Sequence, residues 1–184
     1  TTMYLPETLS RHWTLPTDNT KVLNRLGNFD YTHSTVEPLI STVWVSYYNA
    51  IAQLNNILSN LETTTVSFSH NNDRFIKGEA LGLRAFLHLD VLRFFGPIPD
   101  NADASAISIP YVTEMTKDPN KLISLPYSEV LAAIEKDLTD AEELLAIDPL
   151  ISNSNSVLNN ISSTGENVPK DDWQFYRQGR FNYY

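Results

Sequence analysis

The stretch GEALGLRAFLHLDVLRFFGPIPD, residues 78–100, is largely apolar, yet its helix-like part before Gly96 carries five ionisable side chains. These side chains are Glu79, Arg84, His88, Asp90 and Arg93. Carboxylates and imidazoles are groups that acid–base catalysis uses, so one interpretation is a catalytic acid with a positioning cation. The alternative is that these groups tie neighbouring helices together, because a buried charge without a partner is strongly destabilising. Glu79 and Arg84 would lie about 140° apart on a helix, so we expect them to contact different neighbours.

No catalytic or metal-binding pattern stands beside these groups in the sequence. The histidines at 12, 33, 70 and 88 fit no metal-ligand spacing, and the HExxH, P-loop and GxSxG motifs do not occur. The absence of cysteine excludes a thiolate nucleophile, a Cys-based zinc site and a disulfide. A glycoside hydrolase needs two carboxyl groups about 5–10 Å apart across a cleft, and no pattern pairs them. We therefore predict no enzyme, no catalytic residue, no cofactor and no metal.

Four polar or aromatic residues in loop-like contexts are candidates for binding sugar. Trp13 and Trp173 lie beside polar groups, and Asp100 with Asn101 follows the stiff turn Gly96-Pro97-Ile98-Pro99. Sugars bind by stacking their C–H face on an aromatic ring while amides and carboxylates take the hydroxyl groups. The alternatives are that the tryptophans only pack and that the turn, with Pro97 and Pro99, only stops a helix.

Length and charge limit the remaining function classes. The 184 residues include 22 acidic and 13 basic ones, for a net charge of −9. Nucleic acid and anionic membrane surfaces need a positive face, so neither is an expected partner. No apolar run approaches the roughly 18–20 residues of a membrane span. No leader-like segment opens the chain at Thr1, so we expect either a cytosolic protein or one whose leader has been removed. A first residue other than Met favours trimming or an engineered start.

Three amphipathic helices must position these side chains, near 39–61, 73–95 and 126–146. The first shows apolar residues at spacings of three and four: Ile40, Trp44, Tyr47, Ile51, Leu54, Leu58 and Leu61. The second has a strip of small residues that lets another helix approach, formed by Gly78, Gly82, Ala85 and Leu89. The third has Ser124 as its expected N-cap.

The centres of the first two helices are about 34 residues apart, which is the period of tetratricopeptide-type hairpins. We therefore predict an all-α fold of tetratricopeptide-like antiparallel helical hairpins with long irregular loops. A single domain would comprise an irregular arm over 1–38, a helical core over 39–147, a Ser/Asn-rich loop over 148–178 and the start of a truncated helix over 180–184. Strand evidence is limited to ISIPYV, residues 107–112, which alternates across a proline.

Several sequence blocks resemble one known family. WVSYYNAIAQLNNIL resembles a Trp-x3-Tyr-x2-Ile-x3-Asn helix, GEALGLRAFLHLDVLRFFGPIP resembles Gly-Glu-Ala-x2-Leu-Arg-Ala followed by Phe-Gly-x-x-Pro, and IPYV and GRFNYY continue in the same order. This ordered set, from about residue 39 to 184, is similar to the SusD/RagB family of cell-surface glycan-binding lipoproteins. The residues that carry the resemblance as structural motif positions are Trp44, Tyr48, Asn55, Glu79, Arg84, Gly96, Pro97, Pro99 and Arg180.

The resemblance implies a surface-exposed outer-membrane lipoprotein of Bacteroidetes that captures glycans and pairs with a TonB-dependent, SusC-like transporter. Family members are longer and are built on tetratricopeptide-like helices. The acylated N-terminal Cys and the C-terminal portion have no counterpart here, so the chain looks like an N-terminal-region fragment without its lipid anchor. Because family sugar sites use loops from both portions, the completeness of a site in this chain stays open.

Two functions remain in competition after the hydrolase is set aside. The first is a non-catalytic glycan-binding protein that delivers oligosaccharide or polysaccharide fragments to the transporter. The second is a helical protein–protein interaction scaffold that contacts the transporter without itself binding sugar.

Overall fold

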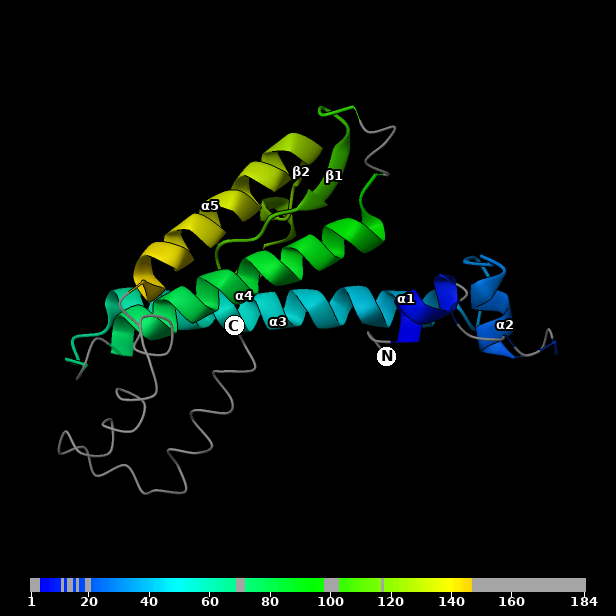
Figure 1. Cartoon of the computed structure of the whole chain (residues 1–184), viewed down its shortest axis with the longest axis horizontal. Helices are drawn as coiled ribbons and strands as arrows, with labels where there is room; N and C mark the ends of the chain where they lie inside the picture. Colours follow the sequence, from blue (N-terminus) through cyan, green and yellow to red (C-terminus); the bar gives the residue numbers. More distant parts are fainter. Residues whose placement is uncertain are drawn as a thin grey trace, which may run out of the picture.

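A computed structural model describes residues 4–10, 12, 15, 17–18, 21–68, 72–97, 103–116 and 118–146. Two short helices, α1 (Tyr4–Leu9) and α2 (Val22–Gly27), precede the long helices α3 (Glu37–Thr63) and α4 (Asn72–Phe95). The strands β1 (Ile107–Pro110) and β2 (Ser124–Pro126) flank a short 3-10 helix, η3 (Pro119–Lys121), and lead into α5 (Tyr127–Leu145). The prediction of an all-α fold is confirmed, since the described strands form only a two-stranded ribbon (Figure 1).

Helix α3 follows the predicted apolar stripe and extends it by about a turn. It begins at Glu37, whose carboxylate lies in the first turn, with a proline directly after it. Acidic side chains near the positive helix N-terminus and proline at the first positions both favour a helix start. The residues that it buries repeat at helical spacing: Val43, Tyr47, Ile51, Leu54, Asn55 and Leu58. Helix α3 therefore presents one continuous face to the rest of the molecule.

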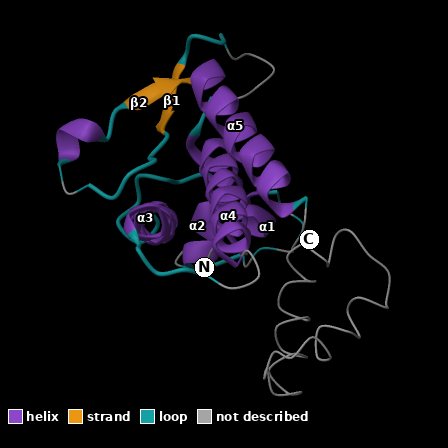
Figure 2. Cartoon of the chain, turned by 90° about the vertical axis from the view of Figure 1, so that its left-hand side faces the viewer, coloured by secondary structure: helices purple, strands orange, loops and turns teal. Residues whose placement is uncertain are grey.

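Helix α4 is the central element, packed against α3 on one side and α5 on the other (Figure 2). The predicted small-residue strip faces α5: a Cβ atom added at Gly78 would lie 2.7 Å from Leu145 Cγ, and one at Gly82 would lie 3.7 Å from Ala141 Cβ. These contacts pair the start of α4 with the end of α5, so the two helices run antiparallel. The absence of side chains on the strip sets how closely they approach.

The first four residues of the segment ISIPYV form β1, which pairs with β2 in an antiparallel ribbon beside α5. Ile107 is opposite Pro126, and Pro110 is opposite Ser124. The expected N-cap at Ser124 is wrong, because this residue belongs to β2 and the N-cap position of α5 is Pro126. Pro126, the last residue of β2, is tolerated because each strand of a two-stranded ribbon has a free edge that needs no backbone donor.

Apolar side chains from α3, α4, α5 and β1 meet in one main core. Ala85, Val91 and Val130 are completely buried, Val43 of α3 is almost completely buried, and Ile109 of β1 closes the core from the ribbon side. A smaller apolar cluster lies between the start of α4 and the ends of α3 and α5. None of the helices in the described residues combines the length and apolarity that crossing a membrane would need.

Candidate functional site

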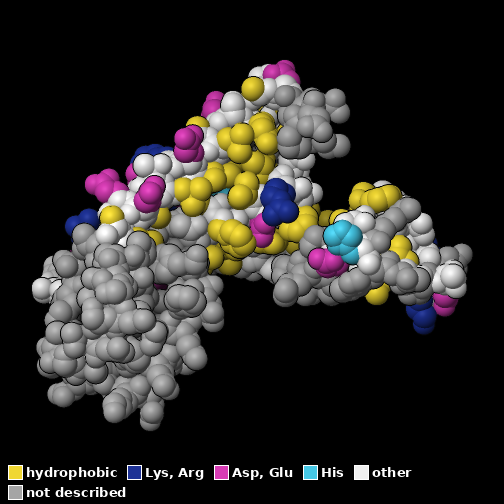
Figure 3. Space-filling view, viewed as in Figure 1, with side chains coloured by type: hydrophobic (Ala, Val, Ile, Leu, Met, Phe, Trp, Pro, Cys, Tyr) yellow, Lys and Arg dark blue, Asp and Glu magenta, His cyan; other side chains and the backbone are white. Residues whose placement is uncertain are grey.

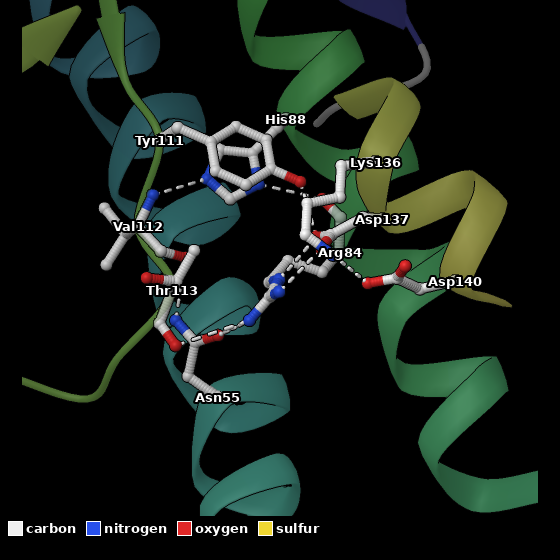
Figure 4. A network of polar contacts seen from close by, with 9 residues as sticks. All are labelled: Asn55, Arg84, His88, Tyr111, Val112, Thr113, Lys136, Asp137 and Asp140. Carbon is white, nitrogen blue, oxygen red and sulfur yellow. Dashed lines mark hydrogen bonds and ion pairs between the residues drawn. The ribbon is translucent and has the colours of Figure 1, made fainter. Parts of the chain in front are cut away.

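A buried ion pair joins the middle of α4 to the middle of α5 (Figure 4). Arg84 Nε donates to Asp137 Oδ2 at 2.7 Å, and Arg84 Nη2 donates to Asp137 Oδ1 at 2.8 Å. Arg84 is 6% exposed and Asp137 is 5% exposed. Two parallel bonds between a guanidinium and a carboxylate form the strongest and most directional arrangement of this kind. The pair fixes the relative position of the two helices.

The remaining donors and acceptors of this pair hold the chain segment that follows β1. Arg84 Nη1 donates to Asn55 Oδ1 at 2.8 Å and to the Thr113 carbonyl at 3.3 Å. Asn55 Nδ2 donates to the Val112 carbonyl at 2.9 Å, and Tyr111 Oη donates to Asp137 Oδ2 at 2.5 Å. Residues 111–113 are thereby bonded to α3, α4 and α5 together.

His88 completes this network from the next turn of α4. Its Nδ1 lies 2.8 Å from the Arg84 carbonyl, and its Nε2 lies 3.0 Å from the Val112 backbone nitrogen. Since the Val112 N–H can only donate, Nε2 is the acceptor and the proton of the neutral ring is on Nδ1. The imidazole also stacks on the Tyr111 ring, with ring centres 3.9 Å apart. Both ring nitrogens are therefore committed to the backbone.

Burial and pairing shift the ionisation of these groups in opposite directions. Burial lowers the pKa of His88 to about 4. Burial also opposes the charge on Arg84, but the hydrogen bonds and charge of Asp137 leave the Arg84 pKa above its ordinary value. Burial and the bond to Asp137 raise the pKa of Tyr111. At neutral pH the network is a charged pair supported by a neutral imidazole and a neutral phenol.

An aromatic depression lies at the C-terminal end of α4, where this helix meets the start of α3. Its volume is about 330 Å³, near the lower end of the range for small-molecule sites. The lining side chains are Tyr31, Glu37, Ile40, Ser41, Trp44 and Phe95. The Trp44 ring contacts Phe95 edge-to-face, with centres 4.9 Å apart, and contacts the tilted ring of Tyr48, with centres 4.7 Å apart. Aromatic faces and two polar side chains thus share one shallow surface.

A second depression, of about 450 Å³, lies beside the start of α2. Its lining residues are Thr17, Asp18, Lys21, Val22 and Leu23, and none of these is aromatic. Within the described part of the chain, no group of three or more His, Asp or Glu side chains is arranged to hold a metal ion.

The predicted glycan contacts Trp13, Asp100, Asn101 and Trp173 lie outside the described residues, as do Pro99 and Arg180. Among the motif residues, Asn55 and Arg84 meet in the buried network. Trp44 and Tyr48 pack together on α3, and Tyr48 Oη donates to the Pro110 carbonyl at 2.8 Å.

The other predicted positions lie apart from the network. Glu79 is half-buried, one turn before Arg84. Gly96 follows the last residue of α4, and a Cβ atom there would lie 2.4 Å from the Leu92 carbonyl oxygen. Pro97, next to it, is half-buried. The lack of room for a side chain at Gly96 therefore explains why the residue after the helix is a glycine.

The partners of Arg84 were not identified from the sequence. Asp137 is an acid within the otherwise apolar buried stripe of α5, which includes Val130, Ile134 and Ala141. An acidic residue at a core position requires a buried cation, and Arg84 on the apolar face of α4 is the matching one. Tyr111 gave no comparable signal, because it lies in a segment without regular structure.

The fold is helical, and its buried charges bind one another and one loop segment. The model of a SusD-like family, described as starch-binding and associating with outer membrane, matches residues 10–152. The chain belongs to this SusD-like family. No curated protein matches the sequence.

Proposed function

We propose that this chain is a non-catalytic glycan-binding protein that captures oligosaccharide at the outer membrane for a TonB-dependent transporter. The match to a starch-binding, outer-membrane-associated family over residues 10–152 is the observation that carries the proposal. The buried ionisable groups support the absence of catalysis, because Arg84, Asp137 and His88 are bonded to one another and to backbone. Groups held in this way serve packing and are not directed at a substrate.

Binding to neutral polysaccharide is the test of this function. Affinity electrophoresis in gels that contain soluble starch, xylan or mannan should show retarded migration in at least one of them. A reducing-sugar assay on the same polysaccharides should show no release above buffer. The proposal would be contradicted if migration were retarded in none of these gels and no glycan of an array were bound. Release of reducing sugar would indicate a hydrolase in place of a binding protein.

A second function, a scaffold that contacts the transporter without binding sugar, is favoured by apolar side chains on the α4–α5 surface. Phe86 of α4 is 53% exposed, and Leu131 and Leu138 of α5 are also exposed. Figure 3 shows hydrophobic side chains gathered over these two helices. Co-purification of the transporter with the wild-type protein but not with a Phe86→Ser variant, without binding to any glycan, would favour this function.

The family also leads us to propose that the protein is lipid-anchored and faces the outside of the cell. Protease treatment of intact cells tests the orientation, since a surface-exposed protein is degraded and a periplasmic one is protected.

A further inference from the structure

The turn after α2 has a backbone conformation that its residue does not favour. Phe29 has φ of 60°, in the left-handed region where glycine is the usual residue. Its N–H donates to the Leu26 carbonyl at 3.0 Å, and the Asp30 N–H donates to the Arg25 carbonyl at 3.0 Å. This pair of bonds is the Schellman arrangement, in which the left-handed position is most often glycine. A bulky residue there is strained in its backbone.

The strained turn presents aromatic rings to solvent. Phe29 is 49% exposed, and Tyr31 is 44% exposed. Their rings contact edge-to-face with centres 6.1 Å apart. Stability alone would favour glycine at position 29 and polar residues on the surface. Strained backbone that carries exposed side chains is a common feature of binding sites, because the geometry is retained for the ligand.

The same turn continues into the aromatic depression, because Tyr31 is one of its lining residues. Phe29 and Tyr31 therefore extend the lining of Trp44 and Phe95 outward. We name this surface, formed by Phe29, Tyr31, Trp44 and Phe95 with Glu37 and Ser41, the aromatic edge. Helix α3 supplies the two polar side chains from its exposed first turns.

The chemistry of the aromatic edge matches a neutral sugar ring. Flat aromatic faces stack on the C–H face of a pyranose, while a carboxylate accepts hydroxyl protons and a serine hydroxyl both donates and accepts. Glu37 at the rim and a net charge of −9 disfavour an anionic ligand such as a uronic-acid polymer. A purely apolar partner would leave Glu37 desolvated without a donor.

We propose that the aromatic edge is a binding site for the pyranose rings of a neutral glycan. The rings stack on Tyr31 and on the exposed part of Trp44, Phe29 extends the platform, and Glu37 and Ser41 bond the hydroxyl groups. The proposal rests on the proposed function and assigns the binding to residues other than the sequence-predicted contacts.

The test uses Trp44 as a local reporter in the full chain. Trp13→Phe with Trp173→Phe leaves Trp44 as the single tryptophan. The glycan that binds the wild type, or maltoheptaose first, is titrated while tryptophan fluorescence is recorded. The double variant should keep the wild-type affinity and show a saturable change in emission. Loss of binding in the double variant would place the site at Trp13 or Trp173 and overturn the proposal.

Variants of the aromatic edge then test each contact by titration calorimetry. Tyr31→Ala and Glu37→Gln should each weaken binding about tenfold, as expected for one stacked ring or one charge-assisted hydrogen bond. The matched controls are Phe86→Ala, an equally exposed aromatic on α4, and Glu129→Gln, an exposed acid in the first turn of α5. Both controls should bind as the wild type does.

The outcomes separate this proposal from the proposed function. A wild type that binds no neutral glycan overturns both. A wild type that binds while Tyr31→Ala and Glu37→Gln retain its affinity overturns only the aromatic edge as the site. Binding of tetramethylammonium with no binding of neutral glycan would show that the edge recognises a cation and would also overturn the proposal.

Discussion

The buried network lies at the middle of α4 and the aromatic edge lies at its C-terminal end, and the two regions are built on opposite principles. Around Arg84, charged and polar atoms are shielded from water and bonded to specific partners. At the aromatic edge, the rings of Phe29 and Tyr31 are exposed on a turn whose backbone is strained. The network is ordered because its polar groups are hydrogen-bonded to one another. The aromatic edge leaves ring surface exposed that a ligand can cover.

This difference indicates which residues stabilise the fold and which are available to contact a ligand. Of the five ionisable residues that first suggest chemistry, Arg84 and His88 belong to the buried network, whose bonds fix residues 111–113 against three helices. The aromatic edge carries a single carboxylate and depends on ring faces. If the protein has the proposed binding function, the charged residues of the network stabilise the fold and the aromatic residues of the edge contact the ligand.

The comparison is broken most strongly by removing the cation of the buried pair. Arg84→Met should lower the free energy of unfolding by about 3–5 kcal/mol, because Asp137 is left buried without its partner. Urea denaturation measures the loss. The matched control is Lys136→Met, which removes an exposed cation paired with Asp140 and should leave stability nearly unchanged. Equal effects of the two variants would show that the Arg84 region is not the more tightly specified one.

Acid should weaken the same region through His88. Its pKa is about 4 in the folded protein and about 6.5 when unfolded, so the unfolded chain binds more protons between these values. The free energy of unfolding should therefore fall by about 3 kcal/mol as the pH decreases from about 6.5 to 4. Thermal melting over this range measures the effect.

His88→Gln is the control for that pH dependence. It removes the titrating group and should flatten the slope of stability against pH between about 4 and 6.5, although its stability at pH 7 is lower. An unchanged slope would mean that other groups, and not His88, produce the acid sensitivity.

The tight contact between α4 and α5 should respond differently at two neighbouring glycines. Gly78→Ala should lower the free energy of unfolding by about 1–2 kcal/mol, because its Cβ atom would lie 2.7 Å from Leu145 Cγ. Gly82→Ala meets only an ordinary contact of 3.7 Å and should raise stability by about 0.5–1 kcal/mol through helix propensity. Melting of both variants checks the helix spacing, and a stabilising Gly78→Ala would contradict it.

The smallest effect is expected at the strained turn. Phe29→Gly should raise the free energy of unfolding by about 0.5 kcal/mol. Glycine removes the strain of the left-handed backbone, and this gain exceeds the entropic cost of a more flexible unfolded chain. The same variant should bind glycan more weakly than the wild type. Opposite signs for stability and affinity sharpen the contrast with Arg84, and a clear loss of stability would show that Phe29 serves packing.

Helical periodicity was sufficient to predict where the long helices lie. The stripe from Ile40 to Leu61 produced α3 within a few residues, and the small residues of α4 predicted that another helix approaches that face. These features depend on spacing within one element. The strand β1 was only weakly indicated, because its pairing with β2 depends on residues 14 or more positions away and its pattern includes a proline.

The composition of the network and of the aromatic edge could not be read from spacing. Asn55, Arg84 and Asp137 come from three different helices and meet only in three dimensions. The left-handed conformation at Phe29 was also unpredictable, because turn rules place glycine or asparagine at such positions. A residue that departs from a local rule is invisible to a method that assumes the rule.

The attachment of residues 110–113 has a consequence for the order in which the molecule assembles. Their bonds to Tyr48 and Asn55 close loops of 62 and 57 residues, and the bond between Tyr111 and Asp137 closes one of 26. Closing long loops is entropically costly, so we expect the helices to associate first and this segment to dock last, in the slow step. The Val112 amide, which donates to His88 Nε2, should then exchange with deuterium only when the whole helical frame opens.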